Sequence, residues 1–322
     1  MLQAAARRMR SLVSKQRIFI VTTLAQRELL QRQLSWITPD HLIIEPFGKN
    51  TAPCIGLSAI HIQNADPDAV MIVLPADHLI CDEKAFFALL RRAVKLVHEH
   101  PGALITIGIE PAYPATGYGY IQRGRLIESR AGRAFQVRAF AEKPNREVAE
   151  QFFHSGEFLW NSGIFIWRVQ TILDYLEELM PDLYDGLCTI RTALGSPDLA
   201  SVTEKTYKQI YSDSIDYGVM EKAKDVYVLE GDFGWSDLGS WEEVYNISDK
   251  DQNGNVVKGE PILKGVHGCY IEADERQIAM IGVENLVVVD TPDALLICDR
   301  EHSQDVKWLV EKLKQKGREN LL

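Results

Sequence analysis

The stretch Val70-Met-Ile-Val-Leu-Pro-Ala-Asp77-His78 gives the strongest indication of the fold. A continuous apolar run of this length is typical of a strand that is buried on both faces of a sheet. In α/β sheets, ligands bind beyond the carboxyl ends of the strands, where Asp77 would lie. A carboxylate there can hold a divalent metal against a phosphate group, or it can cap the following helix. The strand alone does not decide between these two interpretations.

Length, charge and cysteine content restrict the class of protein. The 322 residues suffice for a large core and predict one large domain with an appendage, or two domains. A net charge of −10 argues against nucleic acid as a partner, because phosphate backbones favour basic surfaces. The five cysteines form no C-x-x-C pair, which favours reduced thiols in the cytoplasm over a disulfide framework or a zinc site. No apolar stretch is long enough to span a membrane, so we expect no membrane partner.

Helical and extended patterns alternate over the first part of the chain, which predicts βαβ units with right-handed crossovers. The chain opens on a helix, whereas a doubly wound domain usually opens on a strand. Helices are expected at 2–13, 24–34, 53–65 and 84–98, and strands at 17–22, 41–45, 70–75 and 103–109.

The pattern changes after residue 117 to longer strands around one short helix, followed by helical segments over 169–222. A Lys/Asp/Asn/Gly stretch at 249–254 is a credible linker, so we expect domains at 1–248 and 255–322. The second would be a small β-domain with a closing helix at 301–316. Further strands are expected at 118–122, 135–141, 158–167, 226–230, 268–272, 278–283, 286–290 and 294–298.

The segment from Glu45 to Pro53 lies between a predicted strand and a predicted helix. Asn50 or Thr51 can cap that helix, and helix N-termini also attract anions and offer free N–H groups to a ligand. Capping alone does not explain the preceding Glu-Pro and Gly-Lys pairs, which favours a ligand-binding loop.

Four further motifs each have a structural and a functional interpretation. The glycines of Thr116–Ile121 suit a plain turn or the close approach of a sugar ring. Glu142 and Lys143 form a solvated ion pair, or they bind sugar hydroxyls and a phosphate. Asn161 either bonds to the backbone or reads a polar ligand. Asp216 is either an acid in the first turn of a helix, where the helix dipole favours it, or part of a ligand-binding site.

Asp237 lies in the aromatic loop Gly234-Trp-Ser-Asp-Leu-Gly-Ser-Trp241, and packing explains a carboxylate there poorly. The sequence contains no G-x-S-x-G, H-E-x-x-H, Walker A or G-x-G-x-x-G motif. No other set of catalytic residues therefore competes with the motifs described above.

Taken in order, seven motifs closely resemble those of the mannose-1-phosphate guanylyltransferases, also called GDP-mannose pyrophosphorylases. Individually most of these motifs are weak evidence for a family, but seven of them in the same order are strong evidence. They are Glu45-Pro…Asn-Thr-Ala-Pro53, Leu-Pro-Ala-Asp-His78, Thr-Gly-Tyr-Gly-Tyr-Ile121, Glu-Lys-Pro144, Trp-Asn-Ser-Gly163, Ser-Ile-Asp-Tyr217 and Trp-Ser-Asp-Leu-Gly239.

The resemblance implies a Rossmann-like nucleotidyltransferase domain, with helices on both faces of a mixed, mainly parallel sheet, and a small C-terminal β-helix-like domain. It implies the Mg²⁺-dependent reaction of GTP with mannose 1-phosphate to give GDP-mannose and pyrophosphate. By the family's pattern Asp77 and Asp237 would hold the metal. Glu45, Asn50 and Thr51 would lie near the guanine or ribose. The sugar phosphate would contact Gly117, Tyr118, Glu142, Lys143, Asn161 and Asp216. The catalytic residues would be Asp77, Asp237 and Lys143.

One departure from the family is also expected to matter. Family members begin with a strand and a Gly-rich loop containing an Arg, and no such sequence occurs here. We therefore expect an N-terminally shortened chain with a gap in its sheet, marginal stability and poor activity.

Two alternatives stay open at this point. Base choice rests partly on the absent segment, so another hexose-1-phosphate nucleotidyltransferase fits as well. A non-catalytic paralogue that binds nucleotide sugar is the second alternative, although two retained acids, Asp77 and Asp237, weigh against it. The sequence does not settle the oligomeric state, for which a homodimer is one option.

Overall fold

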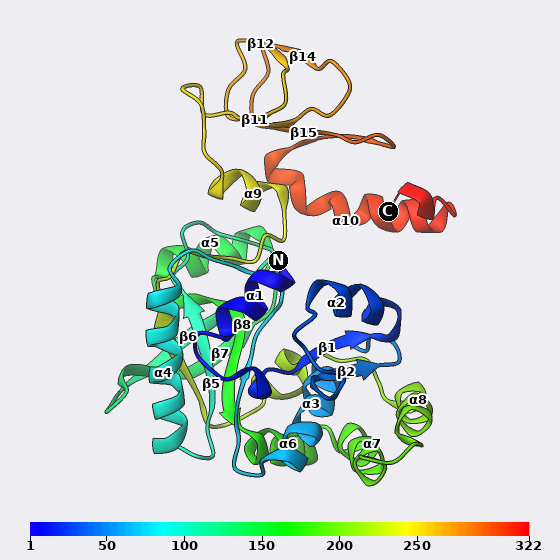
Figure 1. Ribbon diagram of the computed structural model, residues 1–322. Helices are drawn as coiled ribbons and strands as arrows, with labels where there is room; N and C mark the ends of the chain where they lie inside the picture. The colour runs from blue at the N-terminus through cyan, green and yellow to red at the C-terminus, as the bar shows by residue number, and fades with distance from the viewer. Residues whose placement is uncertain (322) are drawn as a thin grey trace. The chain divides into compact units, whose positions relative to one another are not determined.

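The computed structural model describes residues 1–321, which form two compact units that divide between Trp235 and Ser236 (Figure 1). The division falls within the short strand β10 (Trp235–Ser236), ahead of the predicted linker at 249–254. Helix α9 (Trp241–Ile247) explains this position, because its Tyr245 lies in the core of the second unit with Val256 and Tyr270.

A six-stranded mixed sheet forms the centre of the first unit, in the order β3-β8-β5-β9-β7-β6. The expected fold class is confirmed, but the expectation of mainly parallel pairing is wrong for this sheet. Among the described residues its only parallel pair is β5 with β9, because β8 runs antiparallel between β3 and β5. The strands are β3 (Val70–Val73), β5 (Leu104–Ile109), β6 (Tyr120–Ser129), β7 (Gly132–Ala141), β8 (Phe158–Arg168) and β9 (Val226–Gly231).

Strands β1 (Ile20–Thr23) and β2 (Leu42–Glu45) form a separate parallel sheet. Among residues 1–321 neither strand pairs with the six-stranded sheet, in which β3 is an edge strand. Whether this break is the gap expected from the sequence stays a prediction.

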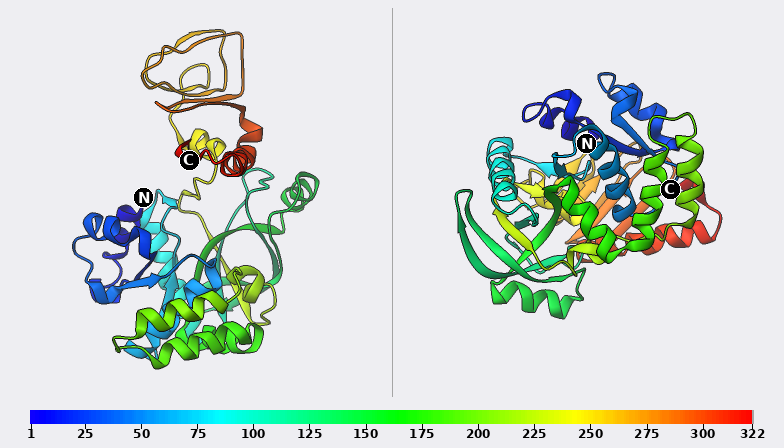
Figure 2. Two further views of the ribbon diagram at one scale, coloured as in Figure 1. Left: turned by 90° about the vertical axis from the view of Figure 1, so that its right-hand side faces the viewer. Right: turned by 90° about the horizontal axis from the view of Figure 1, so that it is seen from below.

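Helices cover both faces of the six-stranded sheet (Figures 1 and 2). Along β8, Ile164 and Ile166 pack in the cluster that contains α4, whereas Phe165 and Trp167 pack in the cluster that contains α3, α6 and α7. This division follows from the two-residue period of a strand. The helices of the unit are α1 (Leu2–Met9), α2 (Arg27–Gln33), α3 (Thr51–Ala65), α4 (Glu83–Glu99), α5 (Arg146–Ser155), α6 (Val169–Leu179), α7 (Pro181–Thr192) and α8 (Leu199–Gln209).

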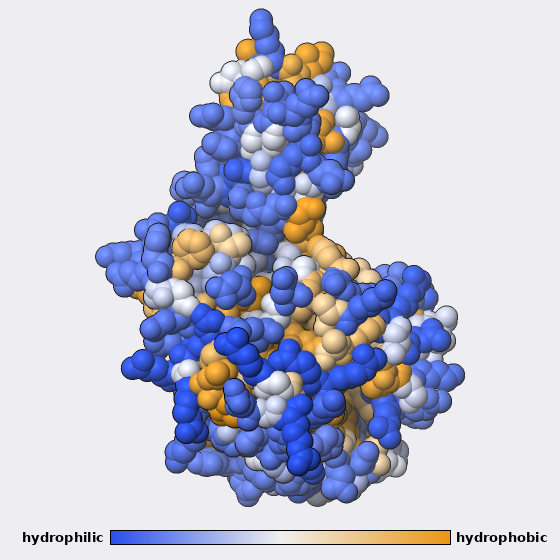
Figure 3. Space-filling view, turned by 90° about the vertical axis from the view of Figure 1, so that its left-hand side faces the viewer, coloured by the Kyte–Doolittle hydropathy of each residue, from blue (hydrophilic) through white to orange (hydrophobic). Residues whose placement is uncertain are grey.

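The second unit has the stacked parallel strands of the expected β-helix-like domain. Two parallel sets, β11-β13-β15 and β12-β14, form its coils, and β16 pairs antiparallel with β15. Apolar atoms are visible at the end that carries β12 and β14, where Ile262 and Ile281 are exposed (Figure 3). The strands are β11 (Val256–Lys258), β12 (Ile262–Lys264), β13 (Tyr270–Glu272), β14 (Ala279–Ile281), β15 (Leu286–Asp290) and β16 (Leu295–Asp299).

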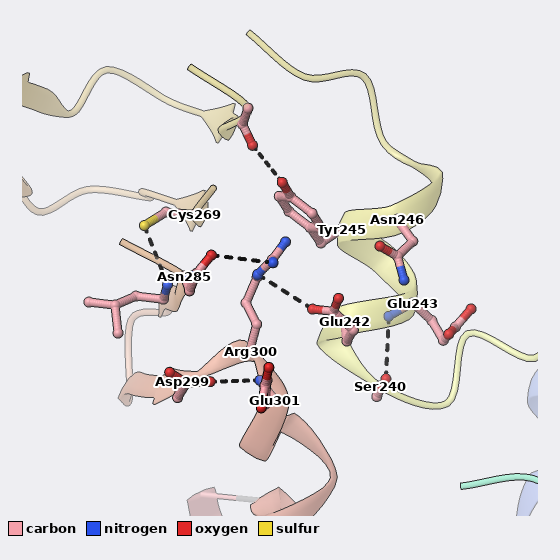
Figure 4. Close-up of polar contacts among 12 residues, drawn as sticks. Ser240, Glu242, Glu243, Tyr245, Asn246, Cys269, Asn285, Asp299, Arg300 and Glu301 are labelled. Carbon is pink, nitrogen blue, oxygen red and sulfur yellow. Dashed lines mark hydrogen bonds and ion pairs between the residues drawn. The ribbon is translucent and has the colours of Figure 1, made fainter. Parts of the chain in front are cut away.

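Arg300 links α9 to the rest of the second unit (Figure 4). Its guanidinium carbon lies 3.8 Å from the centre of the Tyr245 ring, and its Nε lies 3.5 Å from Glu242 Oε2. Its backbone N–H donates to the carbonyl of Asn285 at 2.9 Å. A stacked, charge-paired arginine is well suited to this position because its side chain is planar. Arg300 also starts the 3₁₀ segment η5 (Arg300–Asp305), which precedes α10 (Val306–Gln315).

Candidate active site

Asp77 lies in the loop after β3, and the structure excludes the helix-cap interpretation of its side chain. Helix α4 begins at Glu83, and its cap is Asp82, whose Oδ1 accepts hydrogen bonds from Lys84 N and Ala85 N at 2.9 Å each. The Asp77 side chain is 78% exposed, and its Oδ1 lies 3.9 Å from His78 Nε2. Its carboxylate is therefore available to a ligand.

The Asp77 loop packs against β8, the strand that carries Asn161. A Cβ placed on Gly163 would lie 3.5 Å from Pro75 Cγ and 4.0 Å from His78 Cε1. Trp235 Nε1 donates to His78 Nδ1 at 3.1 Å, which orients the imidazole. Two stretches that are distant in sequence, 75–78 and 161–163, thus lie next to each other.

Asn161 is fixed by three neighbours. Its Nδ2 donates to Asp216 Oδ1 at 2.7 Å, and its Oδ1 accepts from Gly163 N at 3.2 Å and from Thr106 Oγ1 at 3.4 Å. The pairing of β5 with β8 shifts register between Thr106 and Gly108, opposite Asn161. Such bulges redirect side chains and are common beside active sites. Asn161 therefore bonds to the backbone and also orients a carboxylate.

Glu142 and Lys143 follow directly on β7 and join this group. Lys143 Nζ lies 3.1 Å from Glu142 Oε1, and the side chains are 58% and 18% exposed respectively. A Cβ placed on Gly119 would lie 2.5 Å from Glu142 Oε2 and 3.6 Å from Asn161 Cβ. Glu142, Lys143, Asn161 and Asp216 consequently form one cluster, which we call the acid–lysine cluster.

The loop beside this cluster differs in detail from the expectation. Tyr118 is only 5% exposed, and its ring packs against the rings of Trp160 and Trp235. Its side chain thus belongs to the core, and contact of Gly117 or Tyr118 with a substrate stays a prediction. Gly119 was not among the predicted site residues, although a repeated Gly-Tyr pair is typical of a backbone that a neighbour approaches closely.

Asp216 starts the π-helical turn η4 (Asp216–Met220), a feature that is common at functional sites. Burial, and next the charge of Glu142, raises the pKa of Asp216 from 3.8 to about 6. Hydrogen bonding from Asn161 and the charge of Lys143 oppose this rise. A buried carboxyl group with a raised pKa is more typical of a binding site than of a purely structural position.

The raised pKa predicts how Asp216 affects stability. Its pKa of about 6 in the folded protein exceeds the ordinary 3.8, so between these pH values the folded state binds more protons than the unfolded state. Stability from this group is full below pH 4 and is lost as the pH rises through about 6. Asp216→Asn is thus expected to raise the unfolding free energy by about 1–3 kcal/mol at pH 7.5 and by much less at pH 4. Thermal melts at both pH values measure this, and a lower Tm at pH 7.5 contradicts it.

Backbone conformations that are strained for non-glycine residues occur at two of the predicted site residues. Positive φ angles at non-glycine residues occur, within the described part of the chain, at Asn50 (71°), Lys143 (45°), Leu238 (51°) and Asn285 (58°). Two of these are predicted site residues, and Leu238 follows Asp237. Because such conformations cost free energy, they persist where surrounding structure enforces them, often at functional sites.

The predicted nucleotide residues flank the loop between β2 and α3, since Glu45 ends β2 and Thr51 starts α3. Asn50 caps α3, with its side chain accepting from Thr51 N at 2.8 Å. Glu45 is 7% exposed and its Oε1 accepts from the Tyr207 hydroxyl at 3.2 Å. Burial raises the pKa of Glu45, and the hydrogen bond from Tyr207 opposes this rise. At the start of α3, Thr51 N and Ala52 N already have acceptors and Pro53 has no N–H, and Glu45 likewise has a protein partner.

Asp237 is the second residue of the other unit. Its Oδ1 accepts from Gly239 N at 2.8 Å, and a Cβ placed on Gly239 would lie 2.5 Å from its Oδ2. The carboxylate is thus held in a tight turn. Because Asp77 and Asp237 belong to different units, their pairing on one metal stays a prediction.

The donor atoms of Asp77 fit magnesium. Within residues 1–321 there is no group of three or more His, Cys, Asp or Glu side chains that could hold a metal ion. Mg²⁺ does not need such a group, because it is usually bound by one or two carboxylates together with waters and substrate phosphates. The exposed oxygens of Asp77, in a loop beside a lysine-containing cluster, meet that requirement.

Comparison with known families agrees with this architecture. The nucleotidyl transferase family matches residues 1–254, and the MannoseP isomerase/GMP-like beta-helix domain family matches residues 259–313. The fold and the cluster thus place the chain among the nucleotidyl transferases.

No helix within the described residues 1–321 combines the length and apolar character of a membrane span.

Curated relatives narrow this class. The chain is 43% identical over 288 residues to a mannose-1-phosphate guanylyltransferase of Klebsiella pneumoniae, covering 89% of this chain and 60% of that protein. A Vibrio cholerae relative is 38% identical over 320 residues, covering 99% of this chain and 68% of that one. The chain belongs to the mannose-1-phosphate guanylyltransferase family, and it spans 60% of the length of the Klebsiella relative.

Two solved structures share the fold of this chain. A structure described as mannose-1-phosphate geranyltransferase from Thermus thermophilus superimposes with a TM-score of 0.83 at 29% identity, covering 97% of this chain and 89% of that one. A mannose-6-phosphate isomerase structure from Helicobacter pylori gives a TM-score of 0.62 at 27% identity, covering 73% of this chain and 89% of that chain.

Proposed function

We propose that the chain forms GDP-mannose and pyrophosphate from GTP and mannose 1-phosphate. The acid–lysine cluster supports this most directly. It unites a lysine, an amide and two carboxylates from three separate segments, and β8 connects it to the Asp77 loop. Carboxylates suit sugar hydroxyls, and an exposed ammonium suits a phosphate.

The reaction requires positioning more than acid–base chemistry. An oxygen of the mannose phosphate attacks the α-phosphorus of GTP in line, and the bond from that phosphorus to the bridging oxygen breaks as pyrophosphate leaves. Glu142 and Asp216 would accept hydrogen bonds from the sugar, and Asn161 keeps Asp216 oriented at 2.7 Å. Lys143, with its side chain 58% exposed, would neutralise the phosphate.

Asp77 and Asp237 are the residues that would hold Mg²⁺, which when bound offsets negative charge on the phosphates. A metal would also let a chain with a net charge of −10 accept polyanionic substrates. Asn50 and Thr51, at the start of α3, would lie near the guanine or ribose. All five cysteines are free thiols, which supports the cytoplasm as the compartment.

The decisive test combines turnover with binding. We expect the chain to release pyrophosphate from GTP only when mannose 1-phosphate and Mg²⁺ are both present, and to bind GDP-mannose in calorimetry. Parallel reactions with ATP, UTP, dTTP and glucose 1-phosphate decide base and sugar choice. GDP-mannose binding without any release would favour the non-catalytic paralogue, and the absence of both would overturn the proposal.

A further inference from the structure

Three hydrogen bonds join the predicted nucleotide loop to the segment that ends in Asp216. Ile215 N donates to Thr51 Oγ1 at 2.8 Å, and Ala52 N donates to the carbonyl of Asp213 at 3.1 Å. Lys49 Nζ donates to the carbonyl of Ile210 at 2.7 Å. We call these three bonds the clasp. They connect residues 49–52 with residues 210–215, although the two stretches are far apart in sequence.

The Thr51 hydroxyl supplies an acceptor to a buried backbone N–H, that of Ile215. Ile215 is fully buried and directly precedes the π-helical turn η4, so its N–H lies where a helix supplies no internal acceptor. A buried N–H without an acceptor is costly, and the Thr51 hydroxyl provides one. Lys49 plays a similar role at the other end of this segment, because Ile210 is the C-cap of α8 and its carbonyl accepts from Lys49 Nζ.

The clasp acts on the orientation of Asp216. Asp216 is the next residue after Ile215, and its carboxylate meets Asn161 Nδ2 at 2.7 Å. Thr51 in turn follows Asn50, whose φ of 71° is strained and whose side chain accepts from Thr51 N. Any ligand that fixes the start of α3 would thereby also fix the Ile215 N–H and the carboxylate beside it.

Resting on the function proposed above, we infer that Thr51 is a positioning residue through which nucleotide binding and sugar-phosphate binding strengthen each other. The nucleotide orders residues 49–52, and the clasp transmits that order to Asp216 in the acid–lysine cluster. Such a coupling is reciprocal: mannose 1-phosphate must strengthen nucleotide binding by the same factor.

The coupling factor tests this inference without turnover. Calorimetry would measure the Kd of mannose 1-phosphate with and without saturating guanosine 5′-(α,β-methylene)triphosphate, whose bond to the α-phosphorus does not break. We expect at least about 5-fold tighter binding with the analogue. In Thr51→Val the factor should fall to about 1, and in Thr51→Ser, which keeps the hydroxyl, it should be retained.

Two further variants keep the test decisive. Thr203→Val removes a hydroxyl that bonds within α8, to the carbonyl of Leu199, and should keep the coupling. Lys49→Met removes a different clasp bond and replaces Thr51→Val should that variant fail to fold. Unchanged coupling in Thr51→Val or Lys49→Met overturns the inference, as does wild-type binding of both ligands without coupling. Failure of the wild type to bind mannose 1-phosphate would instead count against the proposed function.

Discussion

Asp77→Asn is expected to lower kcat for pyrophosphate release by about 10²–10³-fold relative to the unmodified chain. The substitution keeps the size of the side chain and removes the charge that would hold Mg²⁺ against the phosphates. Folding should change little, because the side chain is 78% exposed and Asp82, not Asp77, caps α4. Steady-state rates at saturating Mg²⁺, with thermal melts alongside, measure both effects.

Asp68→Asn is the matched control for this prediction. Asp68 is exposed and lies just before β3, whereas Asp77 lies beyond the other end of that strand. The control removes the same charge from the same segment and should leave kcat within about twofold. A kcat of Asp77→Asn close to that of the control would remove Asp77 from the proposed metal site.

Gly119→Ala should raise the KM for mannose 1-phosphate by about 10- to 100-fold, which corresponds to the loss of a hydrogen bond to a charged group. The new Cβ would lie 2.5 Å from Glu142 Oε2, so the carboxylate must move away. The displaced atom is the end of a flexible side chain, and the backbone of Gly119 needs no positive φ. The protein should therefore fold normally.

Gly102→Ala is the control, because a Cβ there would meet nothing within 4 Å. The KM for GTP should change far less than the KM for mannose 1-phosphate, since Gly119 adjoins Glu142 and Asn161 and not the start of α3. Equal changes in both KM values, or none in either, would show that Glu142 does not bind the sugar.

Much of the fold could be predicted from local sequence patterns. Helix α4 repeats apolar residues at helical spacing, and β3 and β5 are short apolar runs, so the helix and strands were expected where they occur. The direction of pairing could not be predicted, because β8 inserts between β3 and β5 only in the folded chain. Strands of two or three residues, such as β4 (Leu79–Ile80), have too few positions to show a period.

Helix α9 was not predicted, because it follows a loop rich in Trp and Gly, although its sequence contains a helix-capping pattern. Ser240 and Glu243 have the spacing of a capping box, and the Ser240 side chain accepts from Glu243 N at 3.3 Å. At the site, the resemblance named Glu142, Lys143, Asn161 and Asp216 as members of one group. Gly119 and the clasp depend on tertiary distances, which no local pattern encodes.

A crystal structure of the chain with GDP-mannose tests the account most directly, because its central claim is that the acid–lysine cluster binds the sugar phosphate. We predict that the mannose lies within hydrogen-bond distance of Glu142 and that its phosphate contacts Lys143, with the guanine at the start of α3. Mannose bound elsewhere, with Lys143 and Glu142 contacting only each other, would contradict the account.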